Sequence, residues 1–354
     1  MHLTRTLAIL LFGFYSSAIS QTFVVVNEQA ELDGMADGTA AWVDINQDGH
    51  IDLNAGNQIW LNDGDGTFSQ MPDTSIASSA VWGDINNDGY PDAVCWAGPG
   101  YMYLNEAGKS LKDISDKLPD FPTKVSLGAT LGDFNGDTYL DIYVGGYESP
   151  AYQLDAMYFG NGDMTFKEVW RTKGTTMPAR GITTADYDED GDLDIYVSNY
   201  RLVANTLWQN NGKGVFAQVE KAAKVDGDGG LGAWGHTIGS SWGDFDNDGD
   251  LDLATKGRLY QNQSASRNYV KVKLVGNDVT DKMAIGSQVR IKIGEEILTR
   301  QVCSSTGQGN QNSTVLHFGL GDHDSDVEAT VFWIGGGSQE VTLKVNTSNT
   351  VTRP

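Results

Sequence analysis

A nine-residue pattern rich in aspartate occurs five times along this 354-residue chain. The pattern is D-x-[DN]-x-D-[GT]-x-x-D, and successive copies start 40, 49, 53 and 58 residues apart. Recurrence at such an interval indicates a repeat architecture, in which each copy builds one supersecondary unit. The first aspartates of the five copies are Asp44, Asp84, Asp133, Asp186 and Asp244.

The residues after each copy predict a β-hairpin. In the first unit, Trp60-Leu61-Asn62 is followed by Gly64 and the aromatic Phe68. An apolar stretch, a turn rich in Asn and Gly and a returning aromatic residue are typical of a hairpin. Each unit then holds about four short strands, the size of a propeller blade. We predict an all-β fold: a β-propeller of five visible repeats at 21–266 and a C-terminal β-module at 267–354. A β-sandwich with Asp-rich turns is the alternative.

The repeated loop has the ligand spacing of a calcium cage. Ca²⁺ takes about 6–8 oxygens, and in a tight loop the side chains at positions 1, 3 and 5 converge. Glycine at position 6 permits the sharp turn, position 7 offers its carbonyl, and aspartate at position 9 closes the cage. The predicted ligands are Asp44, Asn46, Asp48, His50 and Asp52 in loop 1; Asp84, Asn86, Asp88, Tyr90 and Asp92 in loop 2; Asp133, Asn135, Asp137, Tyr139 and Asp141 in loop 3; Asp186, Asp188, Asp190, Asp192 and Asp194 in loop 4; and Asp244, Asp246, Asp248, Asp250 and Asp252 in loop 5.

One loop departs from the pattern. Thr138 replaces the glycine of loop 3, so we expect weaker binding there or backbone strain at position 138. Surface turns rich in Asp and Asn, without metal, are the alternative interpretation of all five loops.

The charge balance agrees with bound cations. The formal net charge is −23, from 47 acidic and 24 basic residues, and five Ca²⁺ would add +10 to give −13. Such an acidic chain is unsuited to nucleic acid or an anionic membrane surface. We predict about five Ca²⁺ ions with a structural role, and an extracellular protein or glycan as the partner.

The first twenty residues predict a signal peptide and hence secretion. A short basic start precedes the apolar residues 7–15, and 18–20 is a small-x-small cleavage site. A membrane or buried helix is the alternative, but a bilayer span takes about 20 apolar residues. The chain has two cysteines, Cys95 and Cys303, far apart in sequence, which we predict to be unbridged. Metal is therefore the expected means of stabilisation.

The repeat stops near Asn268, and the following residues predict a separate β-module. Alternating apolar and polar residues indicate half-buried strands at 269–275 and 289–293. Further strands are expected at 329–334 and 341–345, the latter closing the chain. No long amphipathic helix is expected anywhere.

These features resemble known families. The five loops with their hairpins resemble the FG-GAP/VCBS repeats of integrin α-chain propellers, and residues 23–26 with Asp33-Gly34-Met35 resemble the start of the first repeat in cartilage acidic proteins. The C-terminal residues 268–277, 285–289, 316–321 and Trp333 resemble the ASPIC/UnbV domain. The resemblance implies a secreted, calcium-binding interaction protein. The chain departs at Ile334, where a proline is expected, and in showing five repeats where relatives often have more.

Three functions remain open from the sequence. The first is a secreted adhesion or interaction module, the second a carbohydrate-binding lectin, and the third a calcium-dependent enzyme, for example of natural-product cyclisation or alkylation, with a site at the propeller channel. No known catalytic motif such as G-x-S-x-G or H-E-x-x-H occurs. Arg180 and His236, ahead of loops 4 and 5, are the candidates for a pocket; a structural ring of aromatic residues is the alternative.

Three sequons begin at Asn262, Asn312 and Asn346. They would be glycosylated only in a eukaryotic secretory pathway.

Overall fold

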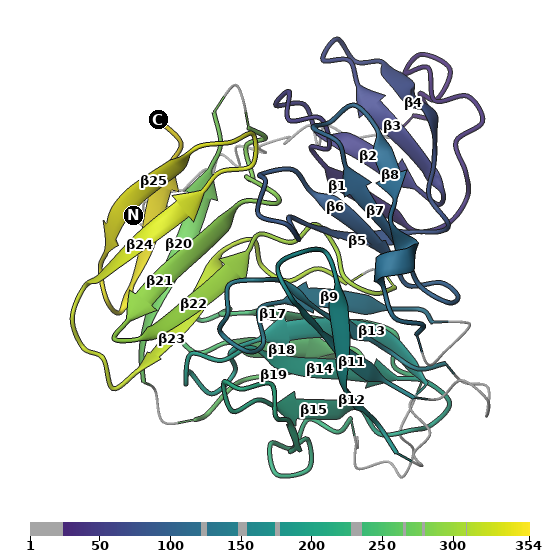
Figure 1. The fold of residues 1–354 in the computed structure, drawn as a ribbon. Helices are drawn as coiled ribbons and strands as arrows, with labels where there is room; N and C mark the ends of the chain where they lie inside the picture. The colour runs from purple at the N-terminus through teal and green to yellow at the C-terminus, as the bar shows by residue number, and fades with distance from the viewer. Residues whose placement is uncertain are drawn as a thin grey trace, which may run out of the picture.

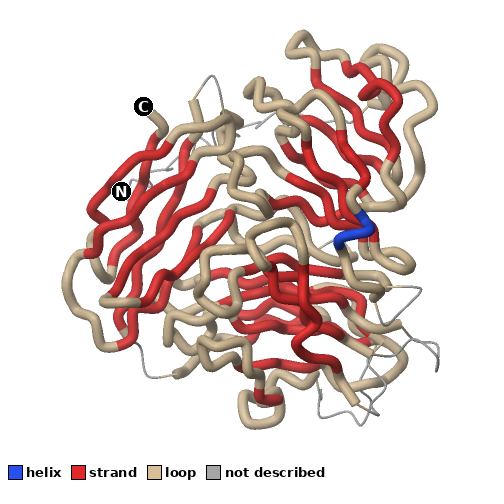
Figure 2. The backbone as a smooth tube through the Cα atoms, in the orientation of Figure 1, coloured by secondary structure: helices blue, strands red, loops and turns tan. Residues whose placement is uncertain are grey.

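The structure is a computed structural model, and it describes residues 24–121, 126–147, 154–173, 178–227, 236–264, 267–277, 280–308 and 310–354. The predicted signal peptide, residues 1–20, lies outside these. The described residues form an all-β protein with a single 3₁₀ turn, η1 (Ser115–Lys117). Figures 1 and 2 show consecutive small sheets followed by a C-terminal module packed beside them.

Each of the five repeats folds into one antiparallel sheet, here called a blade, with its strands in chain order. Blade 1 holds β1 (Ala40–Val43), β2 (Asp52–Ala55), β3 (Gln58–Asn62) and β4 (Phe68–Ser75); blade 2 holds β5 (Ala80–Gly83), β6 (Asp92–Cys95), β7 (Tyr101–Asn105) and β8 (Leu111–Asp113); blade 3 holds β9 (Ala129–Gly132), β10 (Asp141–Val144), β11 (Ala156–Gly160) and β12 (Phe166–Arg171); blade 4 holds β13 (Ala179–Ala185), β14 (Asp194–Asn199), β15 (Thr206–Gln209) and β16 (Ala217–Gln218); blade 5 holds β17 (Ser240–Gly243), β18 (Asp252–Thr255) and β19 (Arg258–Tyr260).

The all-β, propeller-type fold is thus confirmed, with one difference in the last repeat. Blade 5 has three described strands where about four were expected. The chain after Tyr260 lacks the glycine turn of the other repeats, and it passes into the C-terminal module instead.

Neighbouring blades share apolar cores, which explains the composition of their strands. Trp82 of blade 2 packs in one cluster with Val43 and Ile59 of blade 1, and Trp242 of blade 5 packs with Leu207 of blade 4. Strands such as β6 and β10 are buried at every position, because both faces of their sheet are covered. Continuous apolar runs are the expected sequence of strands buried on both faces.

The C-terminal module is a sandwich of two sheets around one core. One sheet has the order β23-β20-β26 and the other β22-β21-β24-β25. The strands are β20 (Asn268–Val275), β21 (Gln288–Ile293), β22 (Glu296–Gln301), β23 (Leu316–Gly321), β24 (Val327–Phe332), β25 (Ser338–Leu343) and β26 (Thr347–Thr352).

The expectation that residues 341–345 close the chain was wrong. After β25 the backbone turns at Asn346, which has a left-handed φ of +55°, and β26 runs parallel to β20. β26 is a polar edge strand, so its sequence, TSNTVT, carries a weak strand signal.

The module also reaches the inner strands of the blades. In the connection between β22 and β23, the Gly307 N–H donates to the Ala129 carbonyl of β9 at 3.1 Å, and the Ser313 N–H donates to the Trp242 carbonyl of β17 at 3.1 Å. Asn310 Oδ1 accepts the Ser240 N–H at 2.7 Å. This connection therefore lies along the strands that line the centre of the repeat array.

Both cysteine thiols are free, and they lie in different parts of the fold: Cys95 in blade 2 and Cys303 in the connection after β22. No described helix is long and apolar enough to cross a membrane.

Candidate metal centres

All five predicted loops occupy the same place, between the first and second strands of a blade. The first aspartate comes directly after the first strand of the blade, and the ninth aspartate begins the second strand. These two strands pair; in blade 1, for example, Val43 pairs with Asp52. Each loop contains two residues with left-handed backbone, at positions 4 and 6. The φ values at position 4 belong to Gln47 (60°), Asn87 (58°), Gly136 (75°), Glu189 (58°) and Asn247 (62°), and those at position 6 to Gly49 (86°), Gly89 (94°), Thr138 (75°), Gly191 (98°) and Gly249 (109°).

The aspartate at position 1 is the centre of each loop. Its Oδ2 accepts the N–H of position 6, at 3.1 Å from Gly49 in loop 1 and at 2.8 Å from Gly89 in loop 2. The same bond occurs in loops 3, 4 and 5. At position 7 the N–H donates to the carboxylate of position 5 in every loop. The predicted side-chain ligands are thus gathered around each turn.

The aspartate at position 9 joins its loop to the third strand of the blade. In loop 4, Asp194 Oδ2 accepts the Tyr187 N–H at 3.2 Å and Asp194 Oδ1 accepts the Asn210 N–H at 2.8 Å. All five loops repeat this pair of bonds. Each carboxylate oxygen has a second lone pair, so the residue can also face a cation.

Loops 4 and 5 each bring three carboxylates close together. Carboxylate oxygens of Asp186, Asp188 and Asp194 lie within 4.8 Å of one another, as do those of Asp244, Asp246 and Asp248. Asp186 Oδ1, Asp188 Oδ1 and Asp244 Oδ1 are buried and have no hydrogen-bond partner among the described residues. Buried, unpaired carboxylate oxygens are costly, and an oxygen-only donor set suits Ca²⁺. The residues present therefore fit a calcium ion.

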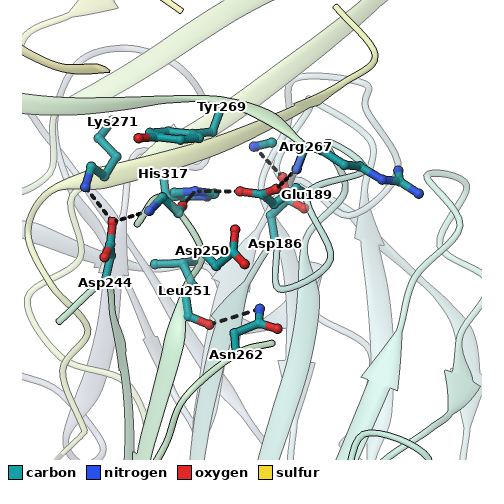
Figure 3. Close-up of polar contacts among 12 residues, drawn as sticks. Asp186, Glu189, Asp244, Asp250, Leu251, Asn262, Arg267, Tyr269, Lys271 and His317 are labelled. Atoms are coloured by element: carbon teal, nitrogen blue, oxygen red, sulfur yellow. Dashed lines mark hydrogen bonds and ion pairs between the residues drawn. The ribbon is translucent and has the colours of Figure 1, made fainter. Parts of the chain in front are cut away.

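The C-terminal module holds the other oxygen of both first aspartates, Oδ2 of Asp186 and of Asp244; Figure 3 shows the contact of Lys271 with Asp244. Arg300 Nη2 lies 3.2 Å from Asp186 Oδ2, and the Gly319 N–H donates to the same oxygen at 2.8 Å. Lys271 forms an ion pair with Asp244 Oδ2. In loops 4 and 5 the module thus fixes Oδ2 of the first aspartate, while Oδ1 of the same aspartate is left for a cation. Such outer partners orient the groups that bind a metal.

His317 of the module lies between loops 4 and 5 (Figure 3). Its Nε2 is 2.8 Å from the Gly249 carbonyl and 3.7 Å from Glu189 Oε1, and its ring stacks on Tyr269 with 5.8 Å between centroids. It was not among the predicted site residues, because only the three-dimensional structure brings β23 to the loops.

Two further kinds of residue were missed, both at the end of the third strand of a blade. Asn210 Nδ2 donates to the Phe134 carbonyl of loop 3, and Asn262 Nδ2 donates to the Tyr187 carbonyl of loop 4. Asn105 Nδ2 likewise donates to the Ile45 carbonyl of loop 1. Gln209 and Gln261 donate to the position-3 aspartates of their own loops. The repeated Asn after an aromatic or aliphatic strand was the signal in the sequence.

Burial raises the pKa of the loop aspartates when no cation is bound. The pKa of Asp44 and of Asp52 rises to about 7, and that of Asp92 and of Asp141 to about 8, in each case mainly through desolvation, with nearby carboxylates adding to it. The folded, metal-free chain therefore binds more protons than the unfolded chain between pH 3.8, the ordinary pKa of aspartate, and about pH 8.

This difference predicts opposite pH dependences with and without calcium. In chelator, the free energy of unfolding should fall as the pH rises through this range, because extra protons are bound to the folded state. In excess Ca²⁺, stability should instead fall on acidification, because protons displace the metal. Denaturant unfolding at about pH 4 and about pH 8, in chelator and in excess Ca²⁺, measures the two dependences. A free energy of unfolding that changes with pH in the same direction in both buffers would contradict the prediction.

Thr138 has the strained backbone that the sequence predicted, with φ at +75° where four loops have glycine. A non-glycine residue in this region costs about 1–2 kcal/mol. We expect Thr138→Gly to raise the free energy of unfolding by about 1 kcal/mol, after the entropy cost of glycine.

The matched control for Thr138→Gly is Gly89→Thr in loop 2. A Cβ at Gly89 would have no atom nearer than 3.9 Å, so the φ of +94° is the main obstacle to a side chain there. Chemical denaturation in Ca²⁺ should show a gain for the first variant and a loss for the second. Equal losses in both would contradict the strain assignment.

The structure places the candidate pocket residues Arg180 and His236 next to the same ring, that of Tyr200. The Arg180 guanidinium lies 4.5 Å from the Tyr200 ring centroid, and the His236 ring lies 4.2 Å from it. Arg180 is largely buried, and it also lies over Tyr147. Residues 228–235, just before His236, lie outside the described residues. A ligand or catalytic role for this group remains a prediction.

The three sequon asparagines are engaged in the fold. The Nδ2 of Asn262, Asn312 and Asn346 donates to Tyr187, Thr184 and Asn268, respectively. Their glycosylation remains a conditional prediction.

Comparison with known proteins identifies both parts of the chain. The family model described as FG-GAP-like repeat matches residues 44–95, 84–144 and 133–197, and the model described as ASPIC and UnbV matches residues 278–354. Cartilage acidic protein 1 from Mus musculus is 28% identical over 255 residues, covering 66% of this chain and 38% of the mouse protein. The human protein is also 28% identical, with 37% of its length covered. The chain thus spans less than two fifths of these relatives.

Two solved structures are more distant. An Agrocybe aegerita lectin, described as recognising non-reducing terminal N-acetylglucosamine, aligns with a TM-score of 0.43 and 18% identity over 87% of this chain and 80% of the lectin. The V. cholerae biofilm matrix protein Bap1 aligns with a TM-score of 0.38 and 13% identity, covering 87% of this chain and 59% of Bap1. From the family matches and the relatives, the chain is a protein of FG-GAP-like repeats with an ASPIC/UnbV domain, homologous to cartilage acidic protein 1.

Proposed function

We propose that this protein is a secreted calcium-binding interaction module, in which one Ca²⁺ per repeat holds the loop to its blade. The observation that carries the proposal is the pair of carboxylate clusters in loops 4 and 5, in which three buried oxygens, Asp186 Oδ1, Asp188 Oδ1 and Asp244 Oδ1, have no partner among the described residues. The loops of repeats 1, 2 and 3 have the same backbone conformation, so we extend the proposal to five calcium sites.

The role of the metal in this proposal is structural. The ninth aspartate connects each loop to the third strand of its blade, and the third-strand Asn connects blades 2, 4 and 5 to the loop of the preceding blade. A cation at the loop would neutralise the carboxylates on which these bonds depend. Ca²⁺ binding by extracellular modules typically has a dissociation constant of about 10⁻⁴–10⁻³ M.

The proposed interaction role follows from the rigid scaffold and the remaining charge. Loops on a rigid scaffold are the usual place for a partner site. With five Ca²⁺ bound the net charge would be −23 + 10 = −13, so an extracellular partner with a neutral or basic surface is favoured. The relationship to cartilage acidic protein 1 supports an extracellular setting.

Equilibrium dialysis with measurement of bound calcium tests the metal assignment. We expect about five Ca²⁺ per chain, consistent with five oxygen cages of this type. Asp246→Asn together with Asp248→Asn should remove one of them, whereas Asp65→Asn, in an exposed hairpin turn outside the loops, should remove none. A chain that binds no calcium at millimolar concentration would overturn the proposal.

The interaction role needs a separate test. The purified, calcium-loaded chain is applied to arrays of extracellular-matrix proteins and of neutral glycans, with and without chelator. Binding to a matrix protein or glycan that chelator abolishes would support the role. Failure to bind any array member would contradict it while leaving the calcium count untouched.

A further inference from the structure

The two ends of the blade array expose apolar residues that are buried at the internal interfaces. At internal interfaces, the third-strand residues Ile59, Met102, Met157 and Leu207 are almost completely buried by the next blade. The equivalent residue of blade 5 is Leu259, and its side chain is 55% exposed. The next blade that would cover it does not follow in the chain.

The residue at position 2 of the loop is also more exposed in blade 5 than in blades 1 to 3. Ile45, Ile85 and Phe134 are buried, but Phe245 of loop 5 is 53% exposed. The carbonyls of Ile45, Phe134 and Tyr187 accept an Asn side-chain amide from the next blade. Among the described residues, no side-chain amide reaches the carbonyl of Phe245, and the same is true of Ile85 at the internal interface between blades 2 and 3, where Asn161 donates to Thr165 instead. The exposure of Phe245 and Leu259 is therefore what distinguishes this end. We call Phe245 and Leu259 the blade 5 end face.

Blade 1 presents the complementary half of this interface. Trp42 is 47% exposed, whereas its equivalents Trp82 and Trp242 are buried against the preceding blade. Asn62 Nδ2 donates to Ile51 of its own blade, and among the described residues there is no preceding loop for it to contact. We call Trp42 and Asn62 the blade 1 end face.

We propose that the blade 5 end face of one copy binds the blade 1 end face of a second copy. Two internal interfaces, of blade 2 on blade 1 and of blade 5 on blade 4, show what each face fits: a loop residue and third strand on one side, and an inner-strand tryptophan with an asparagine amide on the other. Blade 1 carries the same pair of groups, Trp42 and Asn62, and its Trp42 is exposed. Exposed apolar patches of this kind mark interaction sites.

The geometry of the contact sets its strength and the shape of the assembly. Leu32 already packs on Leu53 and Trp60 of blade 1, so less apolar surface is available there than at an internal interface. We therefore expect weak, concentration-dependent association. Because the two faces differ, the contact is heterologous and adds copies head to tail.

Sedimentation of the calcium-loaded chain over a range of concentrations tests the proposal. The wild-type chain should increase in mass with concentration up to high micromolar values. Trp42→Lys and Leu259→Lys should each remain monomeric, since each removes one of the two faces. Val215→Lys, at an exposed apolar position in the β15–β16 turn, should behave as wild type.

Mixing the two monomeric variants is the decisive step. Trp42→Lys retains the blade 5 end face and Leu259→Lys retains the blade 1 end face, so the mixture should form a one-to-one complex and grow no further. Self-association lost in Leu259→Lys but kept in Trp42→Lys would indicate a symmetric contact and overturn the proposal. A wild-type chain that stays monomeric would also overturn it.

A measurement on the unaltered chain guards against misfolded variants. Hydroxyl-radical oxidation of Trp42, measured by mass spectrometry, should decrease as the chain concentration rises. Oxidation that is already low in a dilute monomer would show that the chain covers Trp42 itself, and unchanged high oxidation in an associated sample would place the contact elsewhere. Either result would contradict the proposal.

Discussion

Replacing Asp194 with alanine is expected to lower the free energy of unfolding by about 3–5 kcal/mol, because two N–H groups, one of them buried, lose their carboxylate acceptor at once. Those groups belong to Tyr187, at the start of loop 4, and to Asn210, at the end of the third strand. Asp194 is itself fully buried, so water cannot replace the carboxylate. The substitution would detach the loop from its blade and remove a predicted metal ligand.

Chemical denaturation of Asp194→Ala in chelator separates these two effects. The decrease in the free energy of unfolding in chelator measures the lost hydrogen bonds alone. The additional decrease in Ca²⁺ measures the lost metal binding. Asp194→Asn, which keeps an acceptor oxygen, should lose less in chelator. Asp65→Ala, in an exposed turn, is the control and should be close to neutral. An Asp194→Ala chain within about 1 kcal/mol of wild type in both buffers would contradict this role, given the cost of unpaired N–H groups.

Arg300→Ala is the second substitution with a large expected effect. Arg300 Nη2 lies 3.2 Å from Asp186 Oδ2 and also donates to the Gly191 carbonyl at 2.9 Å. The Arg300 and Asp186 side chains are only 7% and 0% exposed. Removing one partner of such a buried pair costs about 3–5 kcal/mol, because the remaining charge is left uncompensated. Here the loss would also loosen the C-terminal module from blade 4.

The control for Arg300→Ala is Arg171→Ala, which breaks an exposed ion pair with Glu168 on β12. Exposed pairs contribute at most about 1 kcal/mol. Limited proteolysis gives a second readout, since cleavage between the blades and the module should speed up in Arg300→Ala but not in Arg171→Ala. Equal stability of the two variants would contradict the proposed contact between the module and loop 4.

The repeat itself made much of the fold predictable. The aspartate spacing located all five loops between the first and second strands of a blade, and the hairpin residues located the third and fourth strands of blades 1 to 4. Local turn chemistry also predicted the strain at Thr138. These features depend on residues within ten or so positions of one another, which sequence patterns report well.

Contacts between distant residues could not be predicted in this way. Arg300 and Asp186 are 114 residues apart, and nothing in the pattern of either segment indicates the other. The parallel pairing of β26 with β20 joins residues at the two ends of the C-terminal module. The exposure of Trp42 is likewise invisible in sequence, because Trp82 and Trp242 stand in the same pattern and are buried.

Thermal unfolding in Ca²⁺ and then in excess chelator tests the calcium assignment most directly. At a free Ca²⁺ concentration ten times the dissociation constant, each site adds about 1.4 kcal/mol, or about 7 kcal/mol for five sites. The midpoint should then fall by on the order of 10 °C or more in chelator and recover when calcium is restored. A midpoint that does not change with calcium would mean that the loops hold no structural metal, and the calcium-binding account would be wrong.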